Sequence, residues 1–217
     1  MDRPSRSPLA VHWGLDENTV FLNHGSFGAT PTAIREEQRR WQDRMEHEPV
    51  AFLDGEGLEQ MAAARRTLAA MLSCDADDLA LVDNATSGVN TVMRSLVFNE
   101  GDEILVPDHA YQACRNTIDF VAHRWGAKVV TVQLPFPIEG PHVVMKAMLG
   151  AVTDRTVLAM IDTVTSPTGL LMPFEKLTGE LEAQGVSVLL DAAHGVGMVP
   201  LNPVSYTHLT LPTINWV

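Results

Sequence analysis

Short apolar runs alternate with helix-length segments along most of the chain. Five runs are predominantly apolar on both faces: Leu79–Val82, Glu103–Val106, Lys128–Val132, Val157–Ile161 and Val186–Leu190. Between them lie four segments of helical length: Ser87–Phe98, Gln112–Trp125, Val143–Val152 and Phe174–Gln184. Buried strands separated by helices are typical of a parallel sheet. The pattern therefore predicts an α/β fold, a three-layer, mostly parallel sheet with helices on both faces.

Two more helices are predicted ahead of this alternation. Pro31–Glu48 begins with proline and is densely charged, which indicates an exposed helix. Glu56–Leu72 carries apolar residues at helical spacing. We therefore divide the chain into an N-terminal arm, residues 1–30, and a large domain, residues 31–203.

The acidic composition narrows the range of partners. Lys and Arg number 15 against 27 Asp and Glu, a formal net charge of −12, whereas nucleic acid requires a basic surface. No apolar stretch is long enough to span a bilayer, and residues 1–8 contain no apolar signal core. Cys74 and Cys114 lack metal-ligand spacing. The sequence predicts a cytoplasmic protein that binds no nucleic acid, no membrane and no metal ion.

Ligands of such sheets bind beyond the carboxyl ends of the strands. After the first apolar run, Thr86 and Ser87 stand where a helix begins, and a helix start with hydroxyl groups suits a phosphate. The simpler interpretation is an ordinary helix cap. Neither a GxxxxGK[ST] nor a GxGxxG loop is present, which argues against a nucleotide-binding domain.

The later strand ends carry rings, hydroxyls and a carboxylate. His109 and Tyr111 could stack on a planar ligand, and Ser166 lies in a polar turn that could bond a ligand oxygen. Turn chemistry alone would explain all three residues. Asp191 ends the last buried strand and is followed by His194. Because a buried carboxylate is costly unless it is paired, Asp191 predicts a cationic partner such as a protonated ring nitrogen. The alternative is an aspartate that caps the next turn.

Together these residues resemble the class V aminotransferase family of pyridoxal-phosphate enzymes, which has the type I aminotransferase fold. Phe21–Pro31 (FLNHGSFGATP) and Asp108–Tyr111 (DHAY) are similar to its isopenicillin N epimerase-like branch. The similarity extends from about Phe21 to Pro203, in order and at matching spacing. It implies a pyridoxal 5′-phosphate cofactor, an amino-acid substrate and a homodimer in the full-length protein.

The resemblance also implies roles for individual residues. Thr86 and Ser87 would hold the cofactor phosphate. His109 would stack on the pyridine ring, with Tyr111 as the alternative, and Asp191 would pair with the ring nitrogen. Ser166 would lie near the phenolic oxygen, with His194 on the same side. The substrate side would be lined by the loop residues Asn23, His24, Gly25, Ser26 and Phe27.

The family's Schiff-base lysine is missing from the expected place. The chain has three lysines, Lys128, Lys146 and Lys176, and none follows Asp191. In the family the lysine would fall at about residue 217, which is Val217 here. Val204–Thr213 match the translation of a sequencing adaptor, so we interpret residues 204–217 as a non-native tail on an N-terminal fragment. The fragment is predicted to have no catalytic residue and little or no turnover.

Two interpretations of function remain open at this stage. In the first, the parent protein acts on the α-carbon of an amino acid, as an epimerase, a transaminase or a lyase. In the second, the chain is a lysine-free module without catalytic activity that binds a phosphorylated metabolite or a protein partner. Recovery of the reading frame beyond residue 203 would separate them.

Overall fold

The computed structural model describes residues 5–205. The predicted adaptor-derived tail therefore lies outside the described residues from position 206 onward, and it stays a prediction. The chain divides into two compact units, the first ending at Arg66 and the second beginning at Thr67. This boundary falls within helix α4, Gly57–Leu72.

The first unit is a series of short and long helices without a buried core. A 3-10 helix spans Pro8–His12, α1 spans His24–Phe27 and α2 spans Thr32–His47. Helix α3 spans Pro49–Ala51, a π-helical turn spans Phe52–Glu56, and the start of α4 completes the unit. No residue from 5 to 66 is buried. Individual side-chain contacts connect these helices. The Arg44 Nε donates to the Glu56 carboxylate at 2.7 Å, and the Trp41 and Phe52 ring centroids lie 6.2 Å apart.

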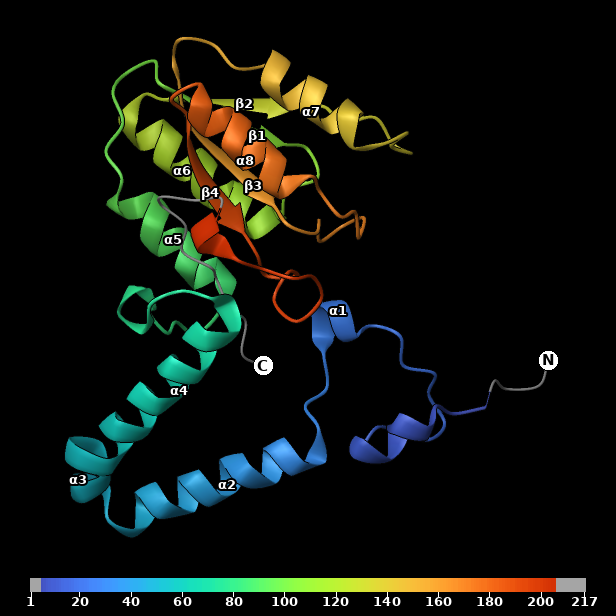
Figure 1. The fold of residues 1–217 in the computed structure, drawn as a ribbon, viewed down its shortest axis with the longest axis vertical. Coiled ribbons are helices and arrows are strands. Elements are labelled where there is room, and N and C mark those ends of the chain that lie inside the picture. Colours follow the sequence, from blue (N-terminus) through green and yellow to red (C-terminus); the bar gives the residue numbers. More distant parts are fainter. Residues whose placement is uncertain (1–4, 206–217) are drawn as a thin grey trace. The chain divides into compact units, whose positions relative to one another are not determined.

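The second unit is built on one parallel sheet with helices on both faces (Figure 1). Its strands are β1, β2, β3 and β4, which span Glu103–Pro107, Lys128–Val132, Thr156–Asp162 and Ser187–Asp191. Its helices α5, α6, α7 and α8 span Ala85–Ser95, Gln112–Trp125, Pro141–Gly150 and Phe174–Ala183, and short 3-10 helices cover Ala76–Asp78 and Pro203–Ser205. Within the described residues the strand order is β2-β1-β3-β4, all parallel. The predicted fold class is confirmed.

Alternation along the strands creates two separate cores. In β1, Ile104 and Val106 point to the face covered by α5 and α6, whereas Leu105 points to the face covered by α7 and α8. Successive side chains of a strand leave opposite faces of the sheet. All three side chains are fully buried, so the runs are apolar at every position because both faces are covered.

One predicted strand is wrong. The segment Leu79–Val82 forms no ladder with another strand in the described part of the chain. Of its apolar residues only Leu79 is buried, in a small cluster with Leu68, Ala69 and Leu72 of α4. A strand requires a neighbour that satisfies its backbone groups, and the apolar run reflects contact with α4 instead.

The strand order reverses direction between β1 and β3. From β1 the chain crosses through α6 to β2 on one side, and from β3 it crosses through α8 to β4 on the other side. Right-handed crossovers in opposite directions place their helices on opposite faces, which matches the positions of α6 and α8 (Figure 1). Such a reversal is where parallel sheets bind ligands, outside the carboxyl ends of the strands.

None of the helices between residues 5 and 205 combines the length and the hydropathy that a membrane crossing needs.

Helix α8 offers a direct test of local stability. Gly179 lies on its exposed surface, and a Cβ built there meets nothing within 4 Å. Gly179→Ala is expected to raise the free energy of unfolding by about 1 kcal/mol, because alanine loses less backbone entropy in a helix. Urea unfolding followed by circular dichroism measures the change.

The control for this prediction is the glycine that ends α6. Gly126 has a φ of 71°, and its Cβ would lie 3.3 Å from the Glu100 Cγ. Gly126→Ala is therefore expected to destabilise the protein by about 1–2 kcal/mol. Equal effects of the two substitutions would contradict the described helix geometry.

Candidate functional site

The reversal between β1 and β3 brings a histidine to a threonine turn. His109 follows the end of β1, and its Nδ1 lies 2.9 Å from the Thr168 Oγ1 in the turn after β3. Thr168 in turn bonds the Thr165 Oγ1 at 2.7 Å, and Thr165 accepts the Leu170 amide at 2.9 Å. This network fixes the His109 ring at the carboxyl edge of the sheet.

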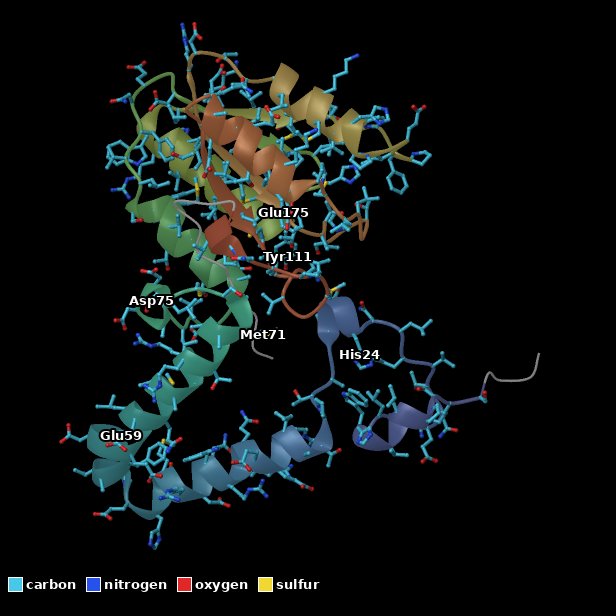
Figure 2. The ribbon with its side chains drawn as sticks, in the orientation of Figure 1. His24, Glu59, Met71, Asp75, Tyr111 and Glu175 are labelled. Carbon is cyan, nitrogen blue, oxygen red and sulfur yellow. The ribbon has the colours of Figure 1, made fainter. Side chains whose placement is uncertain are left out.

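The two candidate stacking rings differ in their environments. His109 is buried, and its ring centroid lies 6.0 Å from that of Phe136. Tyr111 precedes α6 and is 44% exposed; Figure 2 labels it among the side chains of the second unit. A ring that is already held in place loses less conformational entropy when it stacks on a ligand, so this contrast favours His109.

Asp191 lies at the end of β4 and is held from two sides. Its Oδ1 accepts the Ala193 amide at 3.0 Å, and the Cys114 thiol of α6 donates to its Oδ2 at 3.5 Å. Burial, and secondly the Asp191 carboxylate, raise the pKa of the Cys114 thiol far above its ordinary value. Cys114 therefore stays protonated and acts as a donor to Asp191.

A second buried carboxyl, Asp162, stands beside Asp191. The two are register partners at the ends of β3 and β4, and both point to the α5 and α6 face by alternation with Met160 and Leu189. Burial, and secondly the neighbouring Asp191, raise the pKa of Asp162 well above its ordinary value. Its Oδ2 has no hydrogen-bond partner among the described residues.

Neither Asp162 nor Cys114 was among the predicted site residues. Asp162 ends an apolar strand just as Asp191 does, and this shared position is the sequence signal that would have identified it. Cys114 carries no comparable signal, because a cysteine in a helix ordinarily fills a core.

The start of α5 has the character of an anion site. The Asn84 side chain caps the helix by accepting the Ser87 amide at 2.8 Å. Thr86 and Ser87 are partly buried, and their hydroxyls take part in no hydrogen bond within residues 5–205. Helix α5 packs on the face toward which Asp191 points. The hydroxyls and the helix dipole are thus available to a negatively charged ligand on that face.

The remaining candidate residues occupy peripheral positions. Ser166 is partly buried in the turn after β3, where Thr165 and Thr168 make the hydrogen bonds. His194 is partly buried in the turn that follows Asp191. Asn23–Phe27 belongs to the first unit, is exposed and forms α1 with its preceding cap. Figure 2 labels His24 in this helix.

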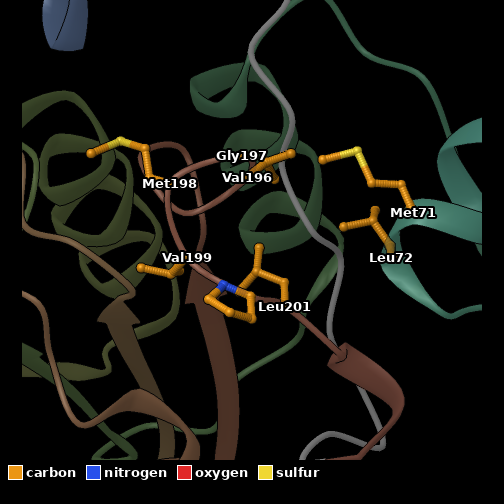
Figure 3. Close-up of a pocket in the computed structure, with 8 residues that line it drawn as sticks. Met71, Leu72, Val196, Gly197, Met198, Val199 and Leu201 are labelled. Atoms are coloured by element: carbon orange, nitrogen blue, oxygen red, sulfur yellow. The ribbon is translucent and has the colours of Figure 1, made fainter.

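An apolar hollow of about 310 Å³ lies in the second unit (Figure 3). It lies between the end of α4 and the segment after the Asp191 turn, and is lined by Met71, Leu72, Val196, Gly197, Met198, Val199, Pro200 and Leu201. Because this lining contains no titratable or hydrogen-bonding side chain, the hollow offers no acid–base chemistry. The chemically competent groups are those at the strand ends.

Comparison with known proteins decides the family. Residues 32–207 match the family described as Aminotransferase class-V. The chain belongs to the class V aminotransferase family. An L-cysteine desulfhydrase of Arabidopsis thaliana is 34% identical over 83% of this chain and 43% of its own length. An isopenicillin N epimerase of Streptomyces clavuligerus is 34% identical over 87% of this chain and 47% of its own length.

Solved structures support the class V fold. The cystine C-S lyase C-DES, in complex with its product cysteine persulfide, superposes with a TM-score of 0.80 at 22% identity, covering 88% of this chain and 51% of C-DES. A C-DES mutant with glycine covalently linked to its PLP cofactor gives a TM-score of 0.81 at 21% identity, covering 92% of this chain and 53% of C-DES. The predicted family and fold are confirmed.

The class V chain spans about half the length of the curated relatives it matches. One relative of the family is named as chloroplastic, so the cytoplasmic location stays a prediction.

Proposed function

We propose that this chain forms the cofactor-binding part of a pyridoxal-phosphate enzyme that acts on the α-carbon of an amino acid. The observation that carries the proposal is Asp191, a buried carboxylate at the carboxyl edge of the sheet, on the face that α5 also covers. A buried carboxylate is stabilised by a cationic partner. When bound, the cofactor would supply an electron-withdrawing ring that stabilises negative charge at the α-carbon.

The chain's own residues fit this group chemically. Thr86 and Ser87 would donate hydroxyl hydrogen bonds to the phosphate at the start of α5. His109, held by Thr168, would lie against the flat face of the ring. Asp191 would keep a proton on the ring nitrogen, since an adjacent carboxylate favours the charged form. Ser166 and His194 would contact the phenolic side.

The relatives narrow the reaction within this proposal. They include an enzyme named for cysteine desulfhydration and one named for isopenicillin N epimerisation. The first name states an amino-acid substrate, and the second states an epimerisation. We therefore place the parent protein among amino-acid lyases and epimerases, with transamination as the third possibility and a homodimer as its assembly. Asn23–Phe27 would line the substrate side.

The 217-residue chain itself is proposed to turn over little or no substrate. None of its three lysines follows Asp191 in the sequence, and none bonds to Asp191 in the described part of the chain. Lys128 begins β2 and bonds the Glu103 carboxylate at 3.1 Å, whereas Lys146 and Lys176 lie in α7 and α8. A lysine that could hold the cofactor covalently as a Schiff base therefore has no candidate next to Asp191.

Cofactor binding by the purified chain tests the proposal. Pyridoxamine 5′-phosphate is a suitable probe because it has no aldehyde that could react with surface lysines. Asp191→Asn is expected to weaken binding by at least about tenfold, since a hydrogen bond to a charged partner is lost. Equilibrium dialysis with absorbance detection measures the dissociation constant.

Asp154→Asn is the matched control, because Asp154 is exposed near the opposite end of β3. Equal affinity of the wild type and Asp191→Asn would contradict the assignment of the ring nitrogen to Asp191. If inorganic phosphate displaced the probe and Asp191→Asn had no effect, the lysine-free phosphate-binding module would be favoured instead.

A further inference from the structure

The buried pair of carboxyls at the ends of β3 and β4 has an unequal environment. Asp191 has two donors, the Ala193 amide on Oδ1 and the Cys114 thiol on Oδ2. Asp162 is equally buried, yet its Oδ2 has no hydrogen-bond partner among the described residues. Donors stabilise the charged form of a carboxyl, and an orphaned buried oxygen disfavours it.

The two carboxyls are too close to carry a charge each. They are register partners on adjacent parallel strands and share one face of the sheet. Strands lie about 4.8 Å apart, and two carboxylates at such a distance in a buried site do not both ionise. The pair therefore keeps one proton at neutral pH.

We propose that Asp162 is a positioning residue for Asp191: it holds the proton of the pair, so that Asp191 alone carries the negative charge, oriented by the Cys114 thiol. The assignment of the proton concerns the ligand-free chain. Its consequence, a single directed charge for the ring nitrogen of the cofactor, rests on the proposed function.

Neighbouring titratable groups do not replace this proton. On the α5 and α6 face, Cys114 is the titratable group that α6 presents to the pair, and burial keeps it a thiol. At the same edge, the His109 Nδ1 is engaged with Thr168, and the Asp108 Oδ1 accepts the Leu134 amide at 3.0 Å. No lysine or arginine side chain has an ion pair with Asp162 or Asp191 within the described part of the chain.

Infrared spectroscopy of the ligand-free chain tests the proposal directly. The carbonyl stretch of a protonated carboxylic acid is expected at neutral pH in the wild type. Asp162→Asn should remove this band, and Asp191→Asn should retain it because burial is the main cause that keeps Asp162 neutral. Absence of the band in the wild type, or its loss only in Asp191→Asn, would overturn the assignment.

The thiol provides a second measurement that does not depend on the stability of an Asp162 variant. In a Cys74→Ser background the remaining S–H stretch belongs to Cys114. It is expected at lower frequency than a free thiol, and to rise when Asp191→Asn weakens the acceptor. An S–H frequency that is the same with and without Asp191→Asn would contradict the contact between the Cys114 thiol and Asp191.

The pH dependence of folding stability provides a third test of the proposal. The pKa of Asp162 is raised in the folded state, so above about pH 4 this residue keeps a proton in the folded chain that it loses in the unfolded chain. The contribution of Asp162 to the folding equilibrium constant, measured as the difference between the wild type and Asp162→Asn, should therefore fall by up to tenfold per pH unit as the pH rises from there. Asp162→Asn should lose this component, and an unchanged profile would contradict the proposal. Since no ligand is present, a failure of the proposed function would show itself separately, in the dialysis experiment.

Discussion

Leu105→Ala is expected to lower the free energy of unfolding by about 2–5 kcal/mol, the range for a leucine deleted from a well-packed core. Leu105 lies in β1, one of the two inner strands of the described sheet, and is completely buried. It belongs to the core between the sheet and helices α7 and α8, which also contains Ala159 and Leu177. Because strands and helices confine this core from both sides, the cavity cannot collapse easily, and the upper half of the range is expected.

Urea unfolding followed by far-UV circular dichroism measures this loss. Leu171→Ala is the matched control, since Leu171 is 62% exposed in the turn region before α8. Its substitution should change the free energy of unfolding by no more than about 0.5 kcal/mol. Similar losses for both variants would show that the described two-sided core is incorrect.

Gly195→Ala is expected to cost about 1–3 kcal/mol through steric overlap. A Cβ at position 195 would lie 2.6 Å from the Thr163 Oγ1 and 3.1 Å from the Thr163 Cβ. Thr163 is completely buried, and its amide donates to the Asp191 carbonyl at 2.9 Å. A β-branched side chain in this position has little rotamer freedom, so the turn after Asp191 has to move.

A double-mutant cycle isolates this contact. Thr163→Ala removes the hydroxyl and the methyl group that the new Cβ would meet, so the double variant should be more stable than the sum of the single effects by about 0.5–3 kcal/mol. Gly179→Ala, which meets no atom within 4 Å, controls for the general effect of alanine. Strict additivity of the two substitutions would contradict the close approach of Gly195 to Thr163.

The apolar pattern predicted most of the fold because the sheet is covered on both faces. Each of the four strands in the described residues overlaps a predicted run, and α6 spans the predicted Gln112–Trp125. The strand predicted at Leu79–Val82 is wrong because an apolar run indicates burial but does not identify the neighbouring element. Leu79 is buried against α4 instead of within a sheet. Pairing is a property of two segments, which a single run does not contain.

The candidate site was predictable only in part, for a similar reason. The sequence places Asp191 at a strand end, as the structure does, and the roles assigned to Asp191, Thr86, Ser87 and His109 stay predictions. The partnership of Asp162 with Asp191 depends on the register of β3 and β4, and register is set by three-dimensional packing. The contact of Cys114 with Asp191 depends on how α6 lies on the sheet, which no local pattern encodes.

The reversed strand order has a kinetic consequence. The contacts that define the site join residues distant in the chain, 59 positions apart for His109 and Thr168 and 77 for Cys114 and Asp191. Contacts with long sequence separation form slowly, because closing a large loop costs conformational entropy before the contact can stabilise the chain. Helices can therefore form in a refolding chain well before these pairs come into contact. The time at which a ligand specific for the site begins to bind would show when the native strand order has formed.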